Sequence, residues 1–395
     1  MVLSVLAIAE LLAMAVWFSA SAVVPALTIT WQLGAAGKAW LTMSVQIGFV
    51  VGALVSTLLN LADRIPSRWF FSVSALIAAG CTAAIPAFAS GPLTAIILRF
   101  FTGLALAGVY PVSMKIVATW TKSDRGIGIG LIVAAIALGS AMPQLLNFYG
   151  GLQEWTSALF TAASLAAIGG LLGAVFVTEG PYATKTPPFD WKYVRTISQN
   201  RNVVLANVGY LGHMWELYAV WTWLPAFLAA SYAVSGVDEK WAALSAFAII
   251  GAGGVGSLLA GWLADKLGRT LIIMISLATS GLCCLTCGLL FGGNPIVLFV
   301  LCIIWGIAVV ADSAQFSASV SELSEPEYIG TALTVQTSLG FLLTILTIRL
   351  VPTLESWVGW QNAFVFLTLG PAVGLIATWK LRRAPDSVRL ASGKR

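Results

Sequence analysis

Charged residues are the scarcest class in this chain. Asp, Glu, Lys and Arg make up 9% of its 395 residues, whereas hydrophobic residues make up 59%. Ordinary soluble domains carry about 25% charged residues, so this composition excludes a water-soluble protein and predicts an integral membrane protein. A membrane-spanning helix needs about 20 apolar residues, and the chain length therefore accommodates twelve such helices joined by short turns. We predict an all-α membrane protein in the lipid bilayer of the inner (cytoplasmic) membrane.

Residues that commonly hold metal ions or carry out redox chemistry are also few. His213 is the only histidine, and all five cysteines lie within apolar runs. Cys284 and Cys287 have the spacing of a redox or metal-binding pair, but small core residues of a membrane helix are the better interpretation. The run 251–256 has the glycine spacing of dinucleotide-binding loops, yet no strand precedes it, so it indicates close helix packing. We predict neither a cofactor nor a metal.

The few basic residues are distributed very unevenly. When successive apolar runs alternate in direction across a membrane, Lys38 and Lys240 fall on one side, while Arg99, Lys115 and Arg349 lie inside runs. The remaining sixteen of the 21 Lys and Arg residues fall on the other side. The positive-inside rule assigns that side, with both chain termini, to the cytoplasm. The net charge of +5 thus comes from loops on one face and does not indicate a nucleic-acid-binding patch.

The apolar runs form two groups of six. A polar segment with three prolines separates them and contains no run long enough to span a membrane. Its stretch 189–197 fits a short interfacial helix or an irregular loop. Residues 1–27 resemble a signal peptide but begin without basic residues, so we expect the first span there. The expected segments are an N-terminal bundle (1–178), a cytoplasmic linker (179–200), a C-terminal bundle (201–382) and a cytoplasmic tail (383–395).

A tightly charged turn occurs once in each half of the chain. The segment 261–269 reads Gly-Trp-Leu-Ala-Asp-Lys-Leu-Gly-Arg and lies between two long apolar runs. Charges spaced so closely cannot lie in hydrocarbon, so the segment must be a water-facing turn between two spans. The segment 61–68 reads Leu-Ala-Asp-Arg-Ile-Pro-Ser-Arg and is a looser copy of the same pattern. The chain therefore looks like one half repeated.

The turn 261–269 resembles the signature Gly-x-x-x-Asp-[Arg/Lys]-x-Gly-Arg-[Arg/Lys] of the major facilitator superfamily and departs from it only at Thr270. The copy 61–68 departs more, for example at Leu59 and Pro66. The resemblance implies twelve transmembrane helices in two pseudo-symmetric six-helix bundles, with a substrate site between them near the midplane. It also implies that the turns act as conformational latches. The predicted latch residues are Asp63, Arg64, Arg68, Asp124, Gly261, Asp265, Lys266, Gly268 and Arg269.

The repeat extends into the spans, and charged residues lie where the repeat predicts a cavity. Glu10 and Trp17 of the first span have the same spacing as Glu216 and Trp223 of the seventh. By resemblance, spans 1, 4, 7 and 10 line the central cavity. A charge inside hydrocarbon costs at least about 2.5–3.5 kcal/mol, so buried ionisable residues there require a reason. The residues predicted to bind substrate or couple protons are Glu10, Trp17, Arg99, His213, Glu216, Trp223, Asp312 and Gln315.

Most of these residues also have a structural interpretation. Arg99 opens a motif that resembles the span 4 arginine motif of the superfamily, which is implicated in proton coupling or substrate charge; alternatively it extends toward lipid headgroups. His213 and Glu216 share a helix face and could carry protons, because imidazole titrates near neutral pH, or form a neutral hydrogen-bonded pair. Asp312 and Gln315 belong to a polar stripe that faces either the cavity or a neighbouring helix.

The function predicted from these features is secondary active transport of a small organic solute by alternating access, coupled to protons. Arg99 favours an anionic solute. We expect a monomer that interacts with substrate, protons and lipids, and no enzymatic activity. The main competing function is a proton-driven antiporter that exports amphipathic or cationic compounds, with Glu10, Glu216 and Asp312 as counter-ions. A membrane-embedded enzyme and a non-transporting sensor are two further functions that compete with transport.

Overall fold

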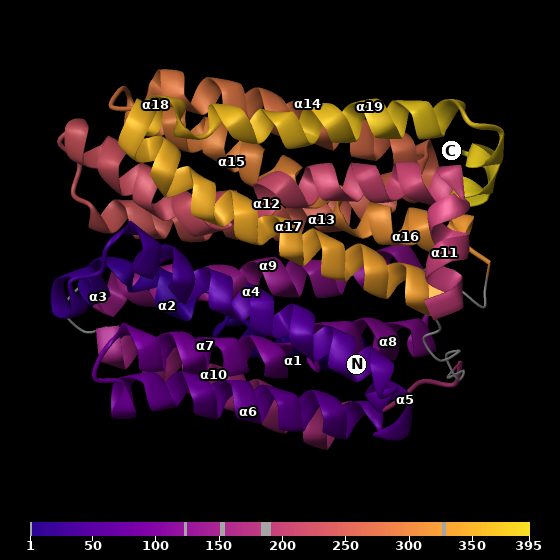
Figure 1. Cartoon of the computed structure of the whole chain (residues 1–395), viewed down its shortest axis with the longest axis horizontal. Coiled ribbons are helices and arrows are strands. Elements are labelled where there is room, and N and C mark those ends of the chain that lie inside the picture. Colours follow the sequence, from indigo (N-terminus) through magenta and orange to yellow (C-terminus); the bar gives the residue numbers. More distant parts are fainter. Residues whose placement is uncertain (1, 122–124, 151–154, 183–190, 326–328) are drawn as a thin grey trace.

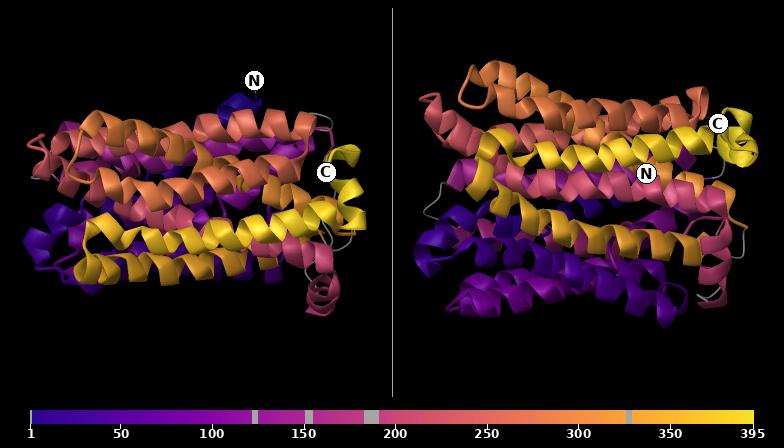
Figure 2. Two further views of the ribbon diagram at one scale, coloured as in Figure 1. Left: turned by 90° about the horizontal axis from the view of Figure 1, so that it is seen from above. Right: turned by 45° about the horizontal axis from the view of Figure 1, so that its top comes forward.

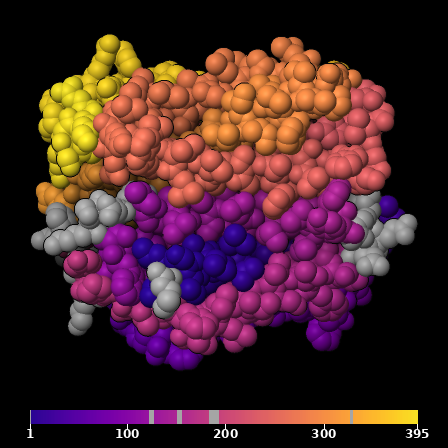
Figure 3. Space-filling model, turned by 180° about the vertical axis from the view of Figure 1, so that it is seen from behind, coloured from indigo at the N-terminus to yellow at the C-terminus, as the bar shows by residue number. Residues whose placement is uncertain are grey.

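The described part of the chain is entirely helical. The computed structural model describes residues 2–121, 125–150, 155–182, 191–325 and 329–395, and these ranges contain helices and turns but no strand. The long helices run side by side, with those of the N-terminal half in one group and those of the C-terminal half in the other (Figure 1). Seen from behind, the two halves meet along a seam that crosses the molecule (Figure 3). This is the predicted architecture of two helical bundles.

The N-terminal bundle follows the predicted apolar runs, but its first and fourth spans are interrupted. Its helices are α1 (Val2–Met14), α2 (Ser19–Ala22), α3 (Val24–Trp31), α4 (Ala35–Leu58), α5 (Leu61–Arg64), α6 (Ser67–Phe88), α7 (Pro92–Leu106), α8 (Tyr110–Trp120), α9 (Arg125–Gly150) and α10 (Trp155–Phe176). The 13 residues of α1 are too few to cross a bilayer alone, so the first span consists of α1, α2 and α3 in succession.

The C-terminal bundle repeats this order after a short linker helix. The linker helix is α11 (Trp191–Gln199). The helices of the bundle are α12 (Arg201–Val234), α13 (Lys240–Leu267), α14 (Arg269–Thr286), α15 (Pro295–Ala311), α16 (Ser313–Leu323), α17 (Ile329–Val358), α18 (Trp360–Ala363) and α19 (Leu369–Arg383), and a 3₁₀ segment (Pro385–Gly393) follows. Among the described residues, eleven helical segments are long and apolar enough to cross a membrane. The interrupted first span brings the number to the predicted twelve.

Spans 4 and 10, which are repeat mates, are both broken near their middle. Span 4 bends between α7 and α8 at Gly108, where an added Cβ would lie 2.1 Å from the Ser74 hydroxyl oxygen. Pro111 then stands in the first turn of α8, where a missing backbone N–H has no effect on the helix. Span 10 breaks between α15 and α16 at Asp312. Span 7 is continuous over the 34 residues of α12, unlike its broken mate, span 1.

Glycines allow α9 and α13 to approach closely where the two bundles meet. An added Cβ at Gly254 would lie 3.1 Å from the Ala134 carbonyl oxygen, and one at Gly130 would lie 3.3 Å from that of Ser257. Other glycines of the run 251–256 face α15, since a Cβ at Gly256 would lie 2.3 Å from the Ile307 carbonyl oxygen. The prediction that this run serves helix packing is therefore confirmed.

The two ends of the bundles differ in character. One end, here called the turn end, carries α5, the α13–α14 turn and the 3₁₀ segment 385–393, and α11 lies across it (Figures 1 and 2). Leu390 of the 3₁₀ segment is fully buried in a small apolar cluster that also contains Ile197 of α11. The other end, here called the opposite end, carries Lys38 at the start of α4 and the loop before α13. The candidate site opens toward the opposite end.

Candidate functional site

A large cavity opens between the two bundles at the opposite end. Its volume is about 690 Å³, and residues of both bundles line it. This cavity, here called the vestibule, falls within the range of about 300–1,000 Å³ that is typical of small-molecule sites. Its wall is largely apolar, with a few polar side chains on spans 1, 2, 5 and 7. These polar and aromatic wall residues are Ser21, Thr42, Gln144, Asn147, Thr222 and Trp223.

Charged residues surround the mouth of the vestibule. Lys38 and Lys240, the two basic residues that the sequence places at this end, both line it, as do Asp238 and Glu239. Lys240 Nζ lies 3.3 Å from Asp238 Oδ2, and the Lys240 backbone N–H donates to Asp238 Oδ1 at 3.0 Å. These hydrogen bonds hold the pKa of Asp238 below its usual value. Two positive and two negative side chains therefore give the mouth no net charge.

Two wall residues of span 5 were not among the site residues predicted from the sequence. The amide of Asn147 donates to the Ala22 carbonyl at 3.2 Å and so bridges spans 5 and 1. Gln144 is 4% exposed, and its amide has no partner among the described residues. Their amides in an otherwise apolar run were the available signal, but the resemblance directs attention to spans 1, 4, 7 and 10.

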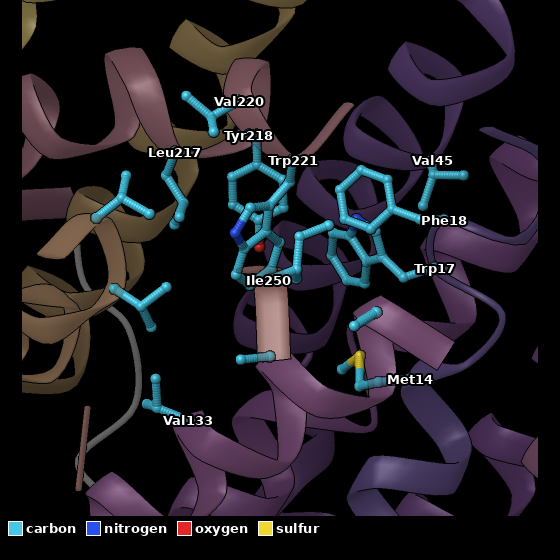
Figure 4. Close-up of a cluster of buried hydrophobic side chains, with 14 of the residues drawn as sticks. Met14, Trp17, Phe18, Val45, Val133, Leu217, Tyr218, Val220, Trp221 and Ile250 are labelled. Atoms are coloured by element: carbon cyan, nitrogen blue, oxygen red, sulfur yellow. The ribbon is translucent and has the colours of Figure 1, made fainter. Parts of the chain in front are cut away.

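A layer of aromatic side chains lies between the two bundles, outside the wall of the vestibule. Trp17 and Phe18, which follow α1, meet Tyr218 and Trp221 of α12 across the boundary between the bundles (Figure 4). Phe18 stacks on Tyr218 with ring centroids 6.1 Å apart, and Trp17 lies 5.9 Å from Tyr218. Phe341 of α17 lies 5.0 Å from Tyr218 and extends the layer into span 11. Such contacts contribute about 0.5–1.5 kcal/mol each beyond the buried area.

A second, much smaller cavity lies beneath this layer. It has a volume of about 40 Å³, and its wall comes from both bundles, including Trp17, Tyr110, Tyr210, Tyr218 and Trp221. We call it the inner cavity. The indole nitrogens of Trp17 and Trp221 are buried and have no hydrogen-bond partner among the described residues. Buried donors are normally paired, so these two N–H groups require an explanation.

Trp17 and Trp223 occupy matching repeat positions but different surroundings. Trp17 lines the inner cavity, whereas Trp223 lines the vestibule and donates from Nε1 to the Ile348 carbonyl at 2.9 Å. The two predicted tryptophans therefore line two different cavities between the bundles.

Arg99 of α7 is fully buried and directs its guanidinium at the break in the first span. Its Nη1 donates to the Val16 carbonyl at 2.6 Å and to Ser19 Oγ at 3.3 Å, and Nη2 donates to the Trp17 carbonyl. Nε donates to the Leu41 carbonyl at 3.3 Å. Carbonyls at a helix end lack intrahelical partners, and Arg99 supplies donors to them. The described wall of neither cavity includes Arg99.

The repeat mates Glu10 and Glu216 are both buried, at 0% and 1% exposure, but bind different spans. Glu10 accepts from the Ser113 hydroxyl of α8 at 2.5 Å. Glu216 accepts from the Ser280 hydroxyl and from the Cys284 thiol of α14, the latter at 3.2 Å. Among the described residues, neither carboxyl group forms an ion pair with a basic side chain.

His213 pairs with span 10. Its Nδ1 lies 2.9 Å from Oδ1 of Asp312, at the break between α15 and α16. The alternative of a neutral His213–Glu216 pair is wrong, because Glu216 is turned toward α14. Nε2 of His213 has no partner among the described residues, and the ring lies 6.1 Å from the ring of Tyr210. Tyr210 lines the inner cavity, whereas His213 and Asp312 do not, so Tyr210 lies between the cavity and the His213–Asp312 pair.

The sequence matches the Major Facilitator Superfamily over residues 6–255 and again over residues 206–395, so the matched ranges cover both bundles. The chain belongs to the major facilitator superfamily. This confirms the prediction made from the repeated turn, and the predicted fold with it.

Individual relatives support the same assignment for this superfamily member. It is 24% identical over 264 residues to the putative niacin/nicotinamide transporter NiaP of Bacillus subtilis (strain 168), covering 65% of this chain and 64% of the relative. It is 24% identical over 308 residues to the gallate transporter of Pseudomonas putida, covering 68% and 66%. The chain thus matches just under two thirds of the length of these relatives.

The fold is also similar to that of solved structures. The crystal structure of a D-xylose-proton symporter superposes with a TM-score of 0.77 over 98% of both chains at 16% identity. The two relatives are named as transporters, and the superposition shows that the chain shares the fold of the solved structure.

In this superfamily member, Arg269 organises the second charged turn. Its Nε and Nη2 donate to the carboxylate of Glu322 at 2.9 and 2.6 Å, and Nη1 donates to Gln315 Oε1 at 3.0 Å. Asp265 Oδ1 lies 3.5 Å from the same guanidinium. Gln315, which the sequence assigned to substrate binding or proton coupling, therefore contacts the turn. Gly268 has a φ of +102° and touches the backbone of Arg395, so a side chain there would be strained.

The first charged turn is held differently. Lys115 of α8 donates to Asp63 Oδ1 at 2.5 Å and to the carbonyl of Ala62. After the turn, the Ser67 hydroxyl donates to Glu179 at 2.6 Å and lowers the pKa of that carboxyl group.

The remaining predicted latch residues have varied positions. Arg64, Arg68 and Lys266 are exposed, and Lys266 Nζ lies 3.6 Å from the ring of Trp262. Gly261 is buried within α13, and Asp124 lies outside the described residues. Their role as latches stays a prediction.

Proposed function

We propose that this protein carries a small organic carboxylate across the cytoplasmic membrane together with a proton, by alternating access. The observation that carries the proposal is the vestibule, whose wall comes from both bundles. In transporters built from two related bundles, the substrate site lies between them, and rocking of the bundles exposes it to each side in turn.

In this proposal the turn end faces the cytoplasm. The turn end carries basic residues such as Arg64, Arg269 and Arg383, whereas the opposite end carries Lys38 and Lys240. Because basic loops are retained in the cytoplasm, the vestibule then opens to the outside. The conformation is outward-open, and the aromatic layer separates the outside from the inner cavity.

Two considerations support a carboxylate as substrate. The name of one relative specifies niacin or nicotinamide and that of another specifies gallate; niacin and gallate are aromatic carboxylic acids, and nicotinamide is an aromatic amide. The wall of the vestibule combines the ring of Trp223 with amides and hydroxyl groups, which suit a small polar ring compound. The fold alone does not carry this assignment, because related folds host many substrates.

Proton coupling rests on the buried carboxyl groups. Glu10 and Glu216 receive hydrogen bonds from hydroxyl and thiol groups but no ion pair among the described residues. An unpaired charge in a membrane is costly, so the protonated form is favoured and proton release requires access to water. Asp312 instead lies beside His213, with Nδ1 of the imidazole 2.9 Å from Oδ1 of the carboxyl group.

Proton-driven antiport of a cation is the second candidate. The observation that favours it is the excess of buried acids. Three acids are buried (Glu10, Glu216 and Asp312), but only two bases (His213 and Arg99) among the described residues. The donors of Arg99 bind backbone carbonyls, so Arg99 does not neutralise an acid. A cation could replace the proton on Glu10 or Glu216.

Protein-dependent proton movement in liposomes distinguishes the two functions. Purified protein is reconstituted with a pH-sensitive dye in the lumen, and aromatic carboxylates, aliphatic carboxylates or amphipathic cations are added outside. Protein-free liposomes correct for passive entry of neutral acids. We expect carboxylates to acidify the lumen in excess of that background. Alkalinisation by cations would establish antiport instead. The absence of a protein-dependent signal with every solute would reject both and favour a sensor.

A further inference from the structure

The inner cavity contains two buried hydrogen-bond donors that the protein leaves unused. Nε1 of Trp17 and Nε1 of Trp221 have no acceptor among the described residues, although the side chains are 2% and 4% exposed. An unpaired buried donor costs about 1–3 kcal/mol. One tryptophan comes from each bundle, and both line the same small space. Two unpaired donors on tryptophans that line one cavity indicate a place for an acceptor that is not part of the chain.

The wall of the inner cavity carries no charge among the described residues. Its polar members are tyrosines, tryptophans and Ser313, and the rest are apolar side chains such as Met14 and Met214. The nearest buried cation of the N-terminal bundle is Arg99, which binds the Trp17 carbonyl from behind together with other backbone oxygens. An anion in this cavity would therefore meet neutral donors and no basic side chain.

The geometry of the aromatic layer favours a flat occupant. The rings that close the cavity stand at centroid distances of 5.0 to 6.1 Å from one another, and they come from both bundles. At about 40 Å³ the cavity is too small for an organic ring as it stands. Separation of Trp17 and Phe18 from Tyr218 and Trp221 would leave a slot lined by aromatic faces. A planar ring in this slot would restore the lost ring contacts.

We propose that the inner cavity is the closed form of the substrate site, and that it binds a planar aromatic ring whose carbonyl or carboxyl oxygen accepts hydrogen bonds from the indole N–H groups of Trp17 and Trp221. This deepens the proposed function and rests on it for the assignment of the occupant as substrate. The site recognises the oxygen through neutral donors, so it does not require a negative charge. Arg99 is a positioning residue that fixes the backbone of Trp17, and it does not contact the substrate.

The proposal is tested by equilibrium binding of radiolabelled benzoate and benzamide to the detergent-solubilised full-length protein. Both probes present a planar ring and an acceptor oxygen, but only benzoate is charged. We expect benzamide to bind at least as tightly as benzoate at pH 7.5, because a site without a basic side chain does not offset the cost of desolvating an anion. A site built around a cation would prefer benzoate, and tighter binding of benzoate than of benzamide would overturn the proposal.

Single substitutions test the two donors. We expect Trp17→Phe and Trp221→Phe each to weaken both probes about tenfold, the value of one hydrogen bond together with lost ring contact. Trp221→His retains a ring N–H and should retain more affinity than Trp221→Phe. Trp305→Phe is the matched control, because Trp305 is fully buried with an unpaired indole nitrogen but packs against Phe364, away from either cavity wall. Wild-type affinity of Trp17→Phe and Trp221→Phe, or equal weakening by Trp305→Phe, would contradict the proposal.

Failure of this proposal and failure of the proposed function give different results. If neither probe binds, yet the protein moves an aliphatic carboxylate along a pH gradient, the inner site is rejected and the transport proposal stands. If no carboxylate moves through the membrane, but benzamide binds and depends on Trp17 and Trp221, the transport proposal is rejected while the aromatic site is supported.

Discussion

Arg269 holds Glu322 with two hydrogen bonds, of 2.9 and 2.6 Å, that run from one guanidinium to the two oxygens of one carboxylate. This fork joins the start of α14 to the end of α16. Glu322 also accepts from the backbone N–H of Ala391 at 3.0 Å, so the 3₁₀ segment after α19 is part of the same network. Hydrogen bonds thus join the charged turn, the tenth span and the 3₁₀ segment after α19 into one unit of the C-terminal bundle.

Replacing Arg269 by lysine should loosen this unit. Lysine keeps the charge but cannot make a planar fork, so we expect Arg269→Lys to lower the stability of the protein by about 1 kcal/mol, a modest value because Glu322 is partly exposed. Thermal unfolding in detergent, followed by tryptophan fluorescence, measures the effect. Lys266→Ala is the control, since Lys266 is exposed and should leave the unfolding temperature nearly unchanged. Equal unfolding temperatures of Arg269→Lys and wild type would contradict the prediction.

Replacing Arg99 should damage the first span rather than the recognition of charge. Both Arg99→Gln and Arg99→Lys remove donors from the carbonyls of Val16 and Trp17, so we expect both variants to unfold at lower temperature. We also expect benzoate and benzamide to lose affinity by the same factor. A loss confined to benzoate would show that Arg99 contacts the substrate carboxylate, as expected from the resemblance.

Neutral replacements of the buried acids should uncouple transport from protons. Glutamine retains the shape of Glu10 and can still accept from Ser113, but it cannot release a proton. We expect Glu10→Gln or Glu216→Gln to abolish uptake driven by a pH gradient while exchange of substrate between equal concentrations persists. Both activities are measured with radiolabelled substrate in proteoliposomes. A variant with unchanged gradient-driven uptake would exclude the substituted residue as the coupling acid.

A cross-link at the turn end should arrest the cycle. The hydroxyl oxygens of Thr57 on α4 and Thr334 on α17 lie 3.4 Å apart across the boundary between the bundles. We expect oxidation of the double variant Thr57→Cys/Thr334→Cys to stop transport and leave binding from the vestibule intact, with recovery after reduction. The single variants serve as controls, because four of the five native cysteines are buried and the fifth is half-buried. Full transport by the oxidised, cross-linked protein would show that the turn end need not open.

Much of the fold could be predicted from the sequence because membrane spans depend on local composition. Apolar runs define the spans, and the repeated turn gives the two-bundle architecture. The buried positions of Glu10, Glu216 and Asp312 also follow from their place within apolar runs, since no other location was available. The repeat further suggests that Glu10 and Glu216 have equivalent partners. In the structure one binds α8 and the other binds α14.

The partners themselves could not be predicted, because they depend on contacts between distant segments. Arg99 reaches carbonyls of Val16 and Trp17, which are available to it only because the first span breaks. No proline or glycine marks the residues between α1 and α2, so the sequence offers little signal for that break. Gln315 belongs to a polar stripe that the sequence could place on one helix face, but only the fold brings it to Arg269.

The glycine-rich contact between α9 and α13 has a mechanical consequence. Gly130 and Gly254 each lie against the backbone of the other helix, so neither residue places a side chain between the two helices. Interlocked side chains would have to separate before one helix could turn against the other. Two helices that touch through their backbones can change their crossing angle while they stay in contact. We therefore expect the bundles to rotate relative to each other about the α9–α13 pair.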